Sequence, residues 1–263
     1  MKGVRLTAAG IVTGWGEGTG SLPEDARAAA GGRVAITIPQ PALDADRFRR
    51  AMHEGMLGVA AIEALLRDGS LARTAIAGTD TALLYVTAGA YGASNRAFLA
   101  ESGQGVYFPY TAASAVPAEV TIEFGLIGEY VIFIGGAPAT LAALGHAARL
   151  LRRGACARAL VLAVETFGDC QDLYASTRWL VGRPLVEAAA CVLLEPCDRG
   201  PASTAPTMAG QFERLAQRRA GETLSAEPLI ALALARDSHY DPVSLSGVWR
   251  DRRARLAWSQ IAG

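Results

Sequence analysis

The chain has 263 residues, 51% of them hydrophobic, so it is long enough for one large or two small domains and too apolar to be disordered. Its 25 basic and 25 acidic residues cancel, which argues against a nucleic-acid-binding protein because such a protein needs a basic surface. No apolar run approaches the roughly 18 residues that a transmembrane helix needs. We therefore expect a protein without a membrane span.

Four cysteines, Cys156, Cys170, Cys191 and Cys197, form no CxxC pair, and two of them lie within apolar runs. A free cysteine in an apolar run behaves as a small hydrophobic residue. We therefore expect a reduced, cytoplasmic protein. Residues 1–12 contain one lysine, one arginine and only a short apolar stretch, which predicts a strand and not a signal peptide.

Short apolar runs alternate with segments of helical periodicity. Strands are predicted at residues 4–12, 82–86, 130–134, 159–165 and 188–194, and helices at residues 25–30, 48–66, 92–101, 112–124 and 139–153. Ser21 and Glu24 have the spacing of a capping box before the first helix. Pro117 is expected to kink the fourth helix or to move its start. This order of elements indicates an α/β layer around a largely buried sheet.

The character of the chain changes after residue 198. Residues 199–206 are rich in Pro, Ser, Ala and Thr and predict a linker, and residues 211–220 and 227–236 predict two helices. Residues 249–257 carry four arginines and one aspartate. We interpret them as a solvated or partner-facing helix near the end of the chain.

Common catalytic motifs are absent. His53, His146 and His239 are far apart and none has a second ligand at metal spacing, so no metal site is expected. There is no P-loop, no GxGxxG after a strand and no GxSxG elbow. Nothing in the sequence predicts a cofactor.

One stretch carries more information: residues 109–154 read PYTAASAVPAEVTIEFGLIGEYVIFIGGAPATLAALGHAARLLRRG. Its FGLIGE turn, its strand YVIFI and its helix ending RLLRRG resemble the "hFGLxGP" turn, the strand and the helix ending "RxIRxG" around the nucleophile of the β-ketoacyl synthases. Further along, the strand ending in Glu165 resembles "GGAE", and VLLEP, which ends at Pro196, resembles "GAGxLVLE". The opening strand at residues 6–16 resembles "VVITGxG".

The resemblance implies the N-terminal half of a thiolase-like fold at residues 1–197, with a mixed five-stranded sheet and helices on both faces. Residues 198–263 would form a linker and a C-terminal helical tail. In that family a second, similar half follows and carries two catalytic histidines and part of the oxyanion hole. Residues 198–263 are too few to form such a half and contain only His239. We interpret His239 as an ordinary surface or loop residue.

The nucleophile of the family is also missing. Counting back from the shared Arg-Arg-Gly end places Ala137 where the family has its cysteine, and the first cysteine of this chain is Cys156. A condensing enzyme uses a thiolate at a helix N-terminus, whose dipole lowers the thiol pKa, to form a thioester. Alanine cannot do this. Gly135, Gly136, Ala137, Pro138 and Thr140 would form a vestigial pocket, in which the Thr140 hydroxyl is a weak nucleophile with no evident base and is best interpreted as a capping or helix-surface group.

Cys170 is the one alternative nucleophile, because in the related fold the residues after the Glu165 strand approach the active-site pocket. Asp169 and Asp172 beside it would raise the pKa of its thiol rather than lower it. A non-catalytic thiol is the favoured interpretation.

Three functions remain open. The first is a non-catalytic ketosynthase-like subunit, similar to a chain length factor, that pairs with an active ketosynthase in polyketide, aryl polyene or fatty-acid-type biosynthesis. It would use the strand-and-helix edge that normally forms the ketosynthase dimer, or form a homodimer if it has no other partner. The second is a decarboxylase or acyltransferase that acts on a malonyl- or acyl-carrier protein. The third is an acyl-carrier-protein binding module, whose Arg250, Arg252, Arg253 and Arg255 would meet the acidic carrier.

Overall fold

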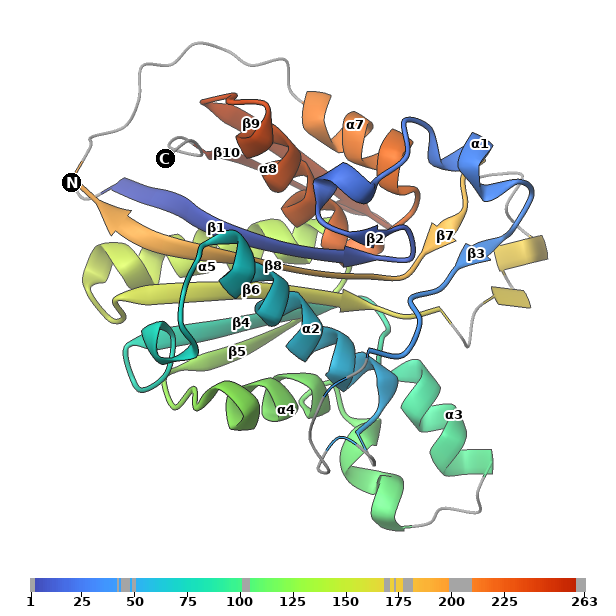
Figure 1. Cartoon of the computed structure of the whole chain (residues 1–263), viewed down its shortest axis with the longest axis horizontal. Coiled ribbons are helices and arrows are strands. Elements are labelled where there is room, and N and C mark those ends of the chain that lie inside the picture. Colours follow the sequence, from blue (N-terminus) through green and yellow to red (C-terminus); the bar gives the residue numbers. More distant parts are fainter. Residues whose placement is uncertain are drawn as a thin grey trace.

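A mixed sheet forms the centre of the computed structural model, which describes residues 3–41, 43, 48, 51–100, 105–167, 171–172, 174–176, 182–198 and 210–258 (Figure 1). The strand order is β2-β1-β8-β6-β4-β5. The strands are β1 (Gly3–Thr13), β2 (Gly16–Glu17), β4 (Thr81–Thr87), β5 (Tyr130–Ile134), β6 (Arg158–Glu165) and β8 (Ala188–Cys197). A separate short pair joins β3 (Ala35–Ile36) to β7 (Leu185–Val186).

The directions of the strands agree with the half fold expected from the sequence. β4 runs parallel to β5 and β6, whereas β8 runs antiparallel to both β1 and β6. All seven residues of β4 are buried, because helices cover both faces of the sheet and leave no side of this strand to water. The five predicted strands are the five long strands of the sheet, and β2 adds two residues beside β1. The predicted fold class is confirmed.

Helices cover both faces of the sheet. They are α1 (Ala26–Ala30), α2 (His53–Asp68), α3 (Gly92–Ala100), α4 (Ala115–Phe124), α5 (Ala137–Arg153), α7 (Gln211–Ala220) and α8 (Glu227–Asp237). One hydrophobic cluster joins α2 and α4 to one face, and a second joins α5 and α8 to the other. The helix α4 begins at residue 115, three residues later than predicted, and Pro117 lies in its first turn. Of the two expected effects of the proline, a kink or a moved helix start, the structure shows the second.

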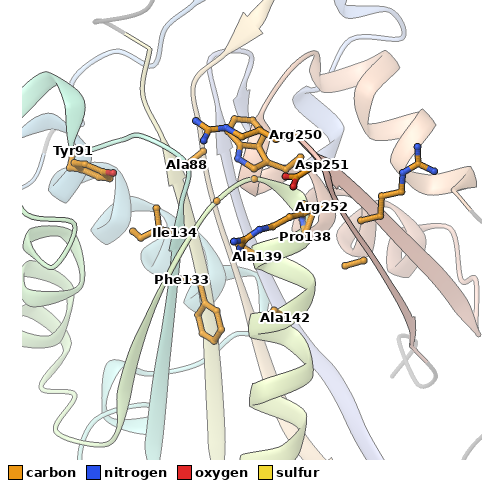
Figure 2. Close-up of a pocket in the computed structure, with 15 residues that line it drawn as sticks. Ala88, Tyr91, Phe133, Ile134, Pro138, Ala139, Ala142, Arg250, Asp251 and Arg252 are labelled. Carbon is orange, nitrogen blue, oxygen red and sulfur yellow. The ribbon is translucent and has the colours of Figure 1, made fainter.

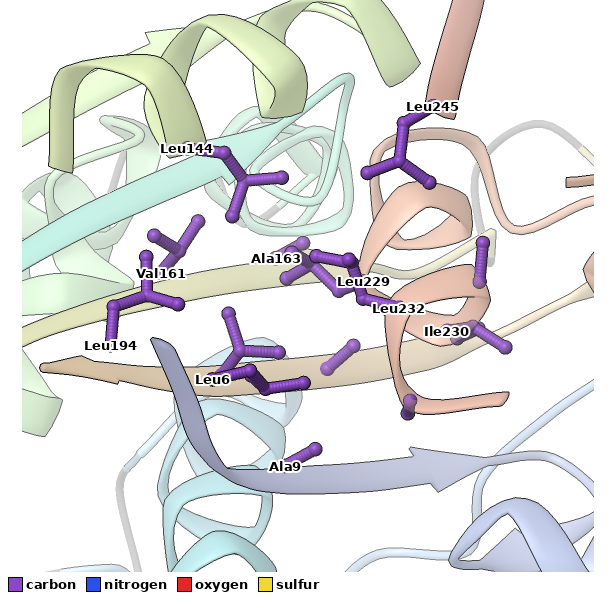
Figure 3. Packing of buried hydrophobic residues seen from close by; sticks show 14 of the residues in the cluster. Leu6, Ala9, Leu144, Val161, Ala163, Leu194, Leu229, Ile230, Leu232 and Leu245 are labelled. Atoms are coloured by element: carbon purple, nitrogen blue, oxygen red, sulfur yellow. The ribbon is translucent and has the colours of Figure 1, made fainter. Parts of the chain in front are cut away.

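The C-terminal segment packs directly on the sheet. Nine of the eleven residues of α8 are buried, among them Leu229, Ile230 and Leu232. These side chains belong to the same cluster as Leu6 of β1 and Val161 of β6, and Figure 3 shows the two groups together. One face of the sheet is thus covered in part by α8 of the same chain. The domain boundary at residue 197 stays a prediction.

The predicted helix at residues 249–257 is wrong. β9 (Val243–Trp249) and β10 (Arg252–Trp258) form an antiparallel hairpin, and Arg250 in its two-residue turn has a φ of +54°. The physical reason is that burial alternates with every second residue, as it does in a strand. Ala254, Leu256 and Trp258 turn inward, whereas the residues between them are exposed. Of the four arginines that suggested a solvated helix, Arg253 and Arg255 occupy outward positions of β10, Arg252 begins the strand and Arg250 lies in the turn.

The capping box is also wrong. The N-cap of α1 is Asp25, whose carboxylate accepts a hydrogen bond of 2.9 Å from the backbone N–H of Ala28. Ser21 instead donates its hydroxyl to the carbonyl oxygen of Gly18 at 2.8 Å. Both residues are good N-caps, and the one nearer the helical run takes the role. The predicted linker at residues 199–206 lies outside the described residues. In the described part of the chain, no helix is long and apolar enough to cross a membrane.

Candidate functional site

The predicted nucleophile turn joins β5 to α5. Gly135 has a φ of +147°, a conformation that L side chains rarely adopt, so glycine is needed where the chain leaves the strand. Gly136 is the N-cap, Ala137 is the first residue of the helix and Pro138 follows within its first turn. A proline is tolerated there because the first backbone N–H groups of a helix have no partner within the helix. The turn therefore keeps the helix N-terminus that would favour an anion but offers no nucleophile.

The hairpin covers this turn. A Cβ atom on Gly247 of β9 would lie 2.9 Å from the Cβ atom of Ala137, and a Cβ atom on Gly136 would lie 2.5 Å from the indole ring of Trp249. Ala137 is consequently only 6% exposed. These close approaches leave no space for a side chain at residues 136 and 247. The helix N-terminus is thus packed against protein where a condensing enzyme would present its thiolate.

Two clefts flank Trp249. The larger, of about 800 Å³, is bounded by the end of β5, the first turns of α5 and the hairpin turn at residues 249–254. We call it the β5 cleft; Figure 2 shows Phe133 and Ile134, Ala139 beside Arg252, and Arg250. The smaller, of about 450 Å³, which we call the α7 cleft, is bounded mainly by α7 and the hairpin. Both are large enough for part of a small organic ligand.

The predicted pocket residues divide between these clefts. Gly135, Gly136 and Pro138 line the β5 cleft, whereas Ala137 lines the α7 cleft. Thr140 lines neither cleft: it is fully buried, and its hydroxyl donates to the carbonyl oxygen of Ser225 at 2.6 Å. Its role in the structure is to hold the C-terminal segment against α5. The sequence interpretation of Thr140 as a surface residue missed this bond because Ser225 is 85 residues away.

Glu165 is the centre of a second buried contact with the C-terminal segment. One carboxylate oxygen accepts from the backbone N–H of Ala88 at 2.6 Å and from the hydroxyl of Ser225, and the other accepts from the backbone N–H of Gly89 at 3.3 Å. The Thr87 hydroxyl adds a longer bond of 3.4 Å. Burial raises the pKa of Glu165 to about 7, although these hydrogen bonds lower it. This carboxyl is therefore partly protonated at neutral pH.

None of the three histidines lines the β5 cleft or the α7 cleft. The His53 imidazole lies 3.3 Å from the Glu187 carboxylate, which also accepts from the backbone N–H of Ile38 at 2.9 Å. Burial raises the pKa of Glu187, but these hydrogen bonds outweigh it and leave the pKa below the ordinary value. His146 lies nine residues along α5 from Ala137, and His239 follows the end of α8. A histidine base for an acyl-transfer step is thus missing from both clefts.

Among the described residues, no cysteine lines either cleft. Burial raises the pKa values of the Cys156 and Cys191 thiols, which disfavours their reactive thiolate forms. Cys170, the alternative nucleophile, lies outside the described residues. No group of three or more metal-ligating side chains is found in the part of the chain that the structure describes.

Sequence reasoning missed the residues that close the site, Gly247, Trp249 and Ser225. The inward alternation of Val243, Leu245 and Gly247 is the signal that could have identified the hairpin. No local signal identifies what the hairpin covers.

Comparison with known proteins agrees with this geometry. The model of the β-ketoacyl synthase N-terminal domain matches residues 37–184, more than half of the chain. No curated protein sequence matches.

Among solved structures, the ishigamide ketosynthase/chain length factor is similar with a TM-score of 0.73 at 19% identity. The AntDE:AntF complex, described as a type II polyketide synthase acyl-carrier protein with its ketosynthase bound to the hexaketide, has a TM-score of 0.74 at 13% identity. A β-ketoacyl synthase from Burkholderia phymatum STM815 has a TM-score of 0.70 at 15% identity.

Each of these three likenesses covers 99% of this chain and 100% of the other chain. At such low identity they establish the fold, and the sequence match establishes the family. The chain therefore belongs to the β-ketoacyl synthase family through its N-terminal domain.

Proposed function

We propose that the chain is a non-catalytic, chain-length-factor-like subunit that pairs with an active β-ketoacyl synthase in polyketide, aryl polyene or fatty-acid-type biosynthesis. The observation that carries the proposal is Ala137 at the N-terminus of α5, with Gly247 packed against it. The methyl group of alanine cannot take an acyl chain as a thioester. The subunit would therefore contribute a surface to the reaction and leave the chemistry to its partner.

The edge of the sheet supports a protein partner. β5 is the last strand of the sheet and is hydrogen-bonded to β4 on one side only. An open strand edge is a ready template for another strand. Tyr130 and Ile134 at the two ends of β5 are 53% and 51% exposed, and Ile122 and Ile127 nearby in the chain are 68% and 72% exposed. Such a concentration of exposed apolar side chains is typical of a protein interface.

The carrier protein is the second partner of the proposed function. One of the similar structures is a ketosynthase in complex with an acyl-carrier protein. A subunit that shapes the site of a ketosynthase would be close to the carrier that delivers the acyl chain. We therefore expect the pair of subunits, rather than this chain alone, to turn over a malonyl-carrier protein.

Co-expression with candidate β-ketoacyl synthases tests the pairing. We expect one complex by size-exclusion chromatography and loss of that complex with Ile134→Asp, since a carboxylate would be buried without a partner. Leu99→Asp is the matched control, because Leu99 of α3 is 77% exposed and lies outside the β5 edge. A chain that stays monomeric beside the ketosynthase would contradict the proposal.

Intact mass spectrometry tests the absence of catalysis. The isolated chain is incubated with malonyl- or acyl-carrier protein, and we expect neither decarboxylation nor an acyl adduct. An adduct on the isolated chain would favour the acyltransferase alternative, and the Cys170→Ala variant would then identify its position.

A further inference from the structure

Two buried glutamates line the α7 cleft without a cationic partner. Glu213 of α7 is 3% exposed and Glu227 of α8 is 6% exposed, and both line the cleft. One oxygen of Glu213 accepts from the backbone N–H of Ser246, and Gln217 donates to one oxygen of Glu227 at 2.9 Å. Among the described residues, neither carboxylate forms an ion pair. A buried carboxylate needs a cation or a proton, because burial disfavours its free charge.

The second oxygen of Glu213 is the sharper observation. It is buried and accepts no hydrogen bond from any group that the structure describes. Native structures rarely leave a buried acceptor in this state, because its lost hydration is not replaced. Four other buried side-chain atoms are also without a partner, but their residues line neither the β5 cleft nor the α7 cleft. The orphaned oxygen of Glu213 thus marks the α7 cleft as the place where a donor is missing.

The other charged groups that line the α7 cleft have partners. Arg183 forms an ion pair of 2.8 Å with Glu222, and Arg214 has a partner of its own. The guanidinium carbon of Arg250 lies 5.9 Å from the ring centre of Trp249, which is within the range of a cation–π contact. The uncompensated negative charge of the cleft therefore lies on the two buried glutamates.

Helix capping does not account for these glutamates. Each lies in the first turn of its helix, where the helix dipole favours a negative charge. Their hydrogen bonds nevertheless come from Ser246 of β9 and from the side chain of Gln217, and not from the first backbone N–H groups of their own helices. The two helix termini thus favour anions at a buried place, which a bound cation would match.

The remaining lining defines the rest of the ligand. Ala137, Leu224, Val248 and Trp249 give the same cleft an apolar part, and its volume of about 450 Å³ suits a small organic molecule. A bare metal ion fits less well, because no group of three or more metal-ligating side chains is found among the described residues. An ammonium group on an apolar body would match both parts of the cleft.

We propose that the α7 cleft binds a primary amine with an apolar body, whose ammonium group donates hydrogen bonds to Glu213 and Glu227. Its three N–H donors are enough to reach the orphaned oxygen of Glu213 and the Glu227 carboxylate together. Burial raises the pKa of Glu227 to about 7; Glu222 and Glu213 add to this rise, whereas Gln217 and Arg183 oppose it. Since a cation favours the ionised carboxylate, the amine should bind more tightly as pH rises through 7.

Isothermal titration calorimetry of the full chain with 2-phenylethylamine tests the proposal. The matched ligand is 2-phenylethanol, which has the same apolar body without the charge, and we expect it to bind at least about tenfold more weakly. Glu213→Gln keeps an oxygen for Ser246 but loses the charge, so it should weaken amine binding about tenfold. Glu17→Gln is the control variant, because Glu17 pairs with Arg67 outside the cleft, and its affinity should stay within about twofold.

The pH dependence gives a second measurement. Affinity of the original chain for the amine should rise up to about tenfold between pH 6 and pH 8, and Glu227→Gln should abolish this rise. Circular dichroism checks that the variants fold; if Glu213→Gln does not, the neutral ligand and the pH dependence still decide. Equal affinity for the amine and the alcohol, undiminished binding by Glu213→Gln, or no binding of the amine at millimolar concentration would each overturn the inference.

Discussion

Replacing Glu165 with glutamine tests the buried contact between the sheet and the C-terminal segment. The Glu165 carboxyl is fully buried and accepts hydrogen bonds from Ala88, Gly89 and Ser225. Glutamine has nearly the same shape and keeps one oxygen for the Ala88 and Ser225 donors. Its amide nitrogen would replace the oxygen that accepts from Gly89 and Thr87, so those two longer hydrogen bonds would be lost at every pH. Glu165→Gln therefore removes the ionisation with little change in packing.

The expected effect depends on pH. Burial raises the pKa of Glu165 from 4.5 to about 7, so between these values the folded state holds a proton that the unfolded state releases. The free energy of unfolding must then fall as pH rises from 4.5 to 7 and level off above 7. At 1.36 kcal/mol per pH unit the full change is about 3 kcal/mol. Glu165→Gln lacks this loss, so its stability relative to the original chain should rise by about 3 kcal/mol across that range.

Urea unfolding at pH 5, 6, 7 and 8, followed by circular dichroism, measures this difference. Burial also raises the pKa of Glu227 to about 7, but that group is present in both proteins and cancels in the comparison. Glu17→Gln is the control, because Glu17 is a half-exposed partner of Arg67, and its difference should stay within about 0.5 kcal/mol at every pH. A constant difference for Glu165→Gln from pH 5 to 8 would refute the reasoning.

Three further substitutions test the packing and the site. Gly10→Ala should cost about 3 kcal/mol of stability in urea, since its Cβ atom would lie 2.0 Å and 2.4 Å from backbone atoms of α2, whereas Gly20→Ala, with open space around it, should be nearly neutral. Gly136→Ala should cost about 1–3 kcal/mol, and most of that cost should disappear in a Trp249→Ala background; equal costs in both backgrounds would contradict the contact. Ala137→Cys should give no condensation product by mass spectrometry in the absence of a ketosynthase, and a product would show that the missing histidines are not required.

The fold was largely predictable because its main signal is local. The strand at residues 82–86 and the strand at residues 159–165 are nearly continuous apolar runs, as expected for strands buried on both faces. The hairpin was not predicted because its turn and its outward side carry arginines and its inward side includes the small residues Gly247 and Ala254. Gly247 is buried by contacts with α5, which lies far from the hairpin in the sequence.

The candidate site was predictable only in part, because some of its features depend on contacts between residues that are far apart in the sequence. The absence of a nucleophile at Ala137 is a matter of residue identity and position, which the sequence records directly. The closure of that position depends on contacts with Gly247 and Trp249, more than 100 residues later in the chain. The polar contacts of Ser225 with Thr140 and Glu165 are equally remote, being 85 and 60 residues apart.

The closed turn and the cover of the sheet have one physical explanation. The C-terminal segment packs α8 on one apolar face of the sheet and places the hairpin over the N-terminus of α5. The hairpin packs against residue 137 through Gly247, so the segment that helps to cover the sheet also crowds one side of the position where the family has its nucleophile. If the proposed function is right, any contribution to catalysis is made through a partner, across the surfaces that the C-terminal segment leaves exposed.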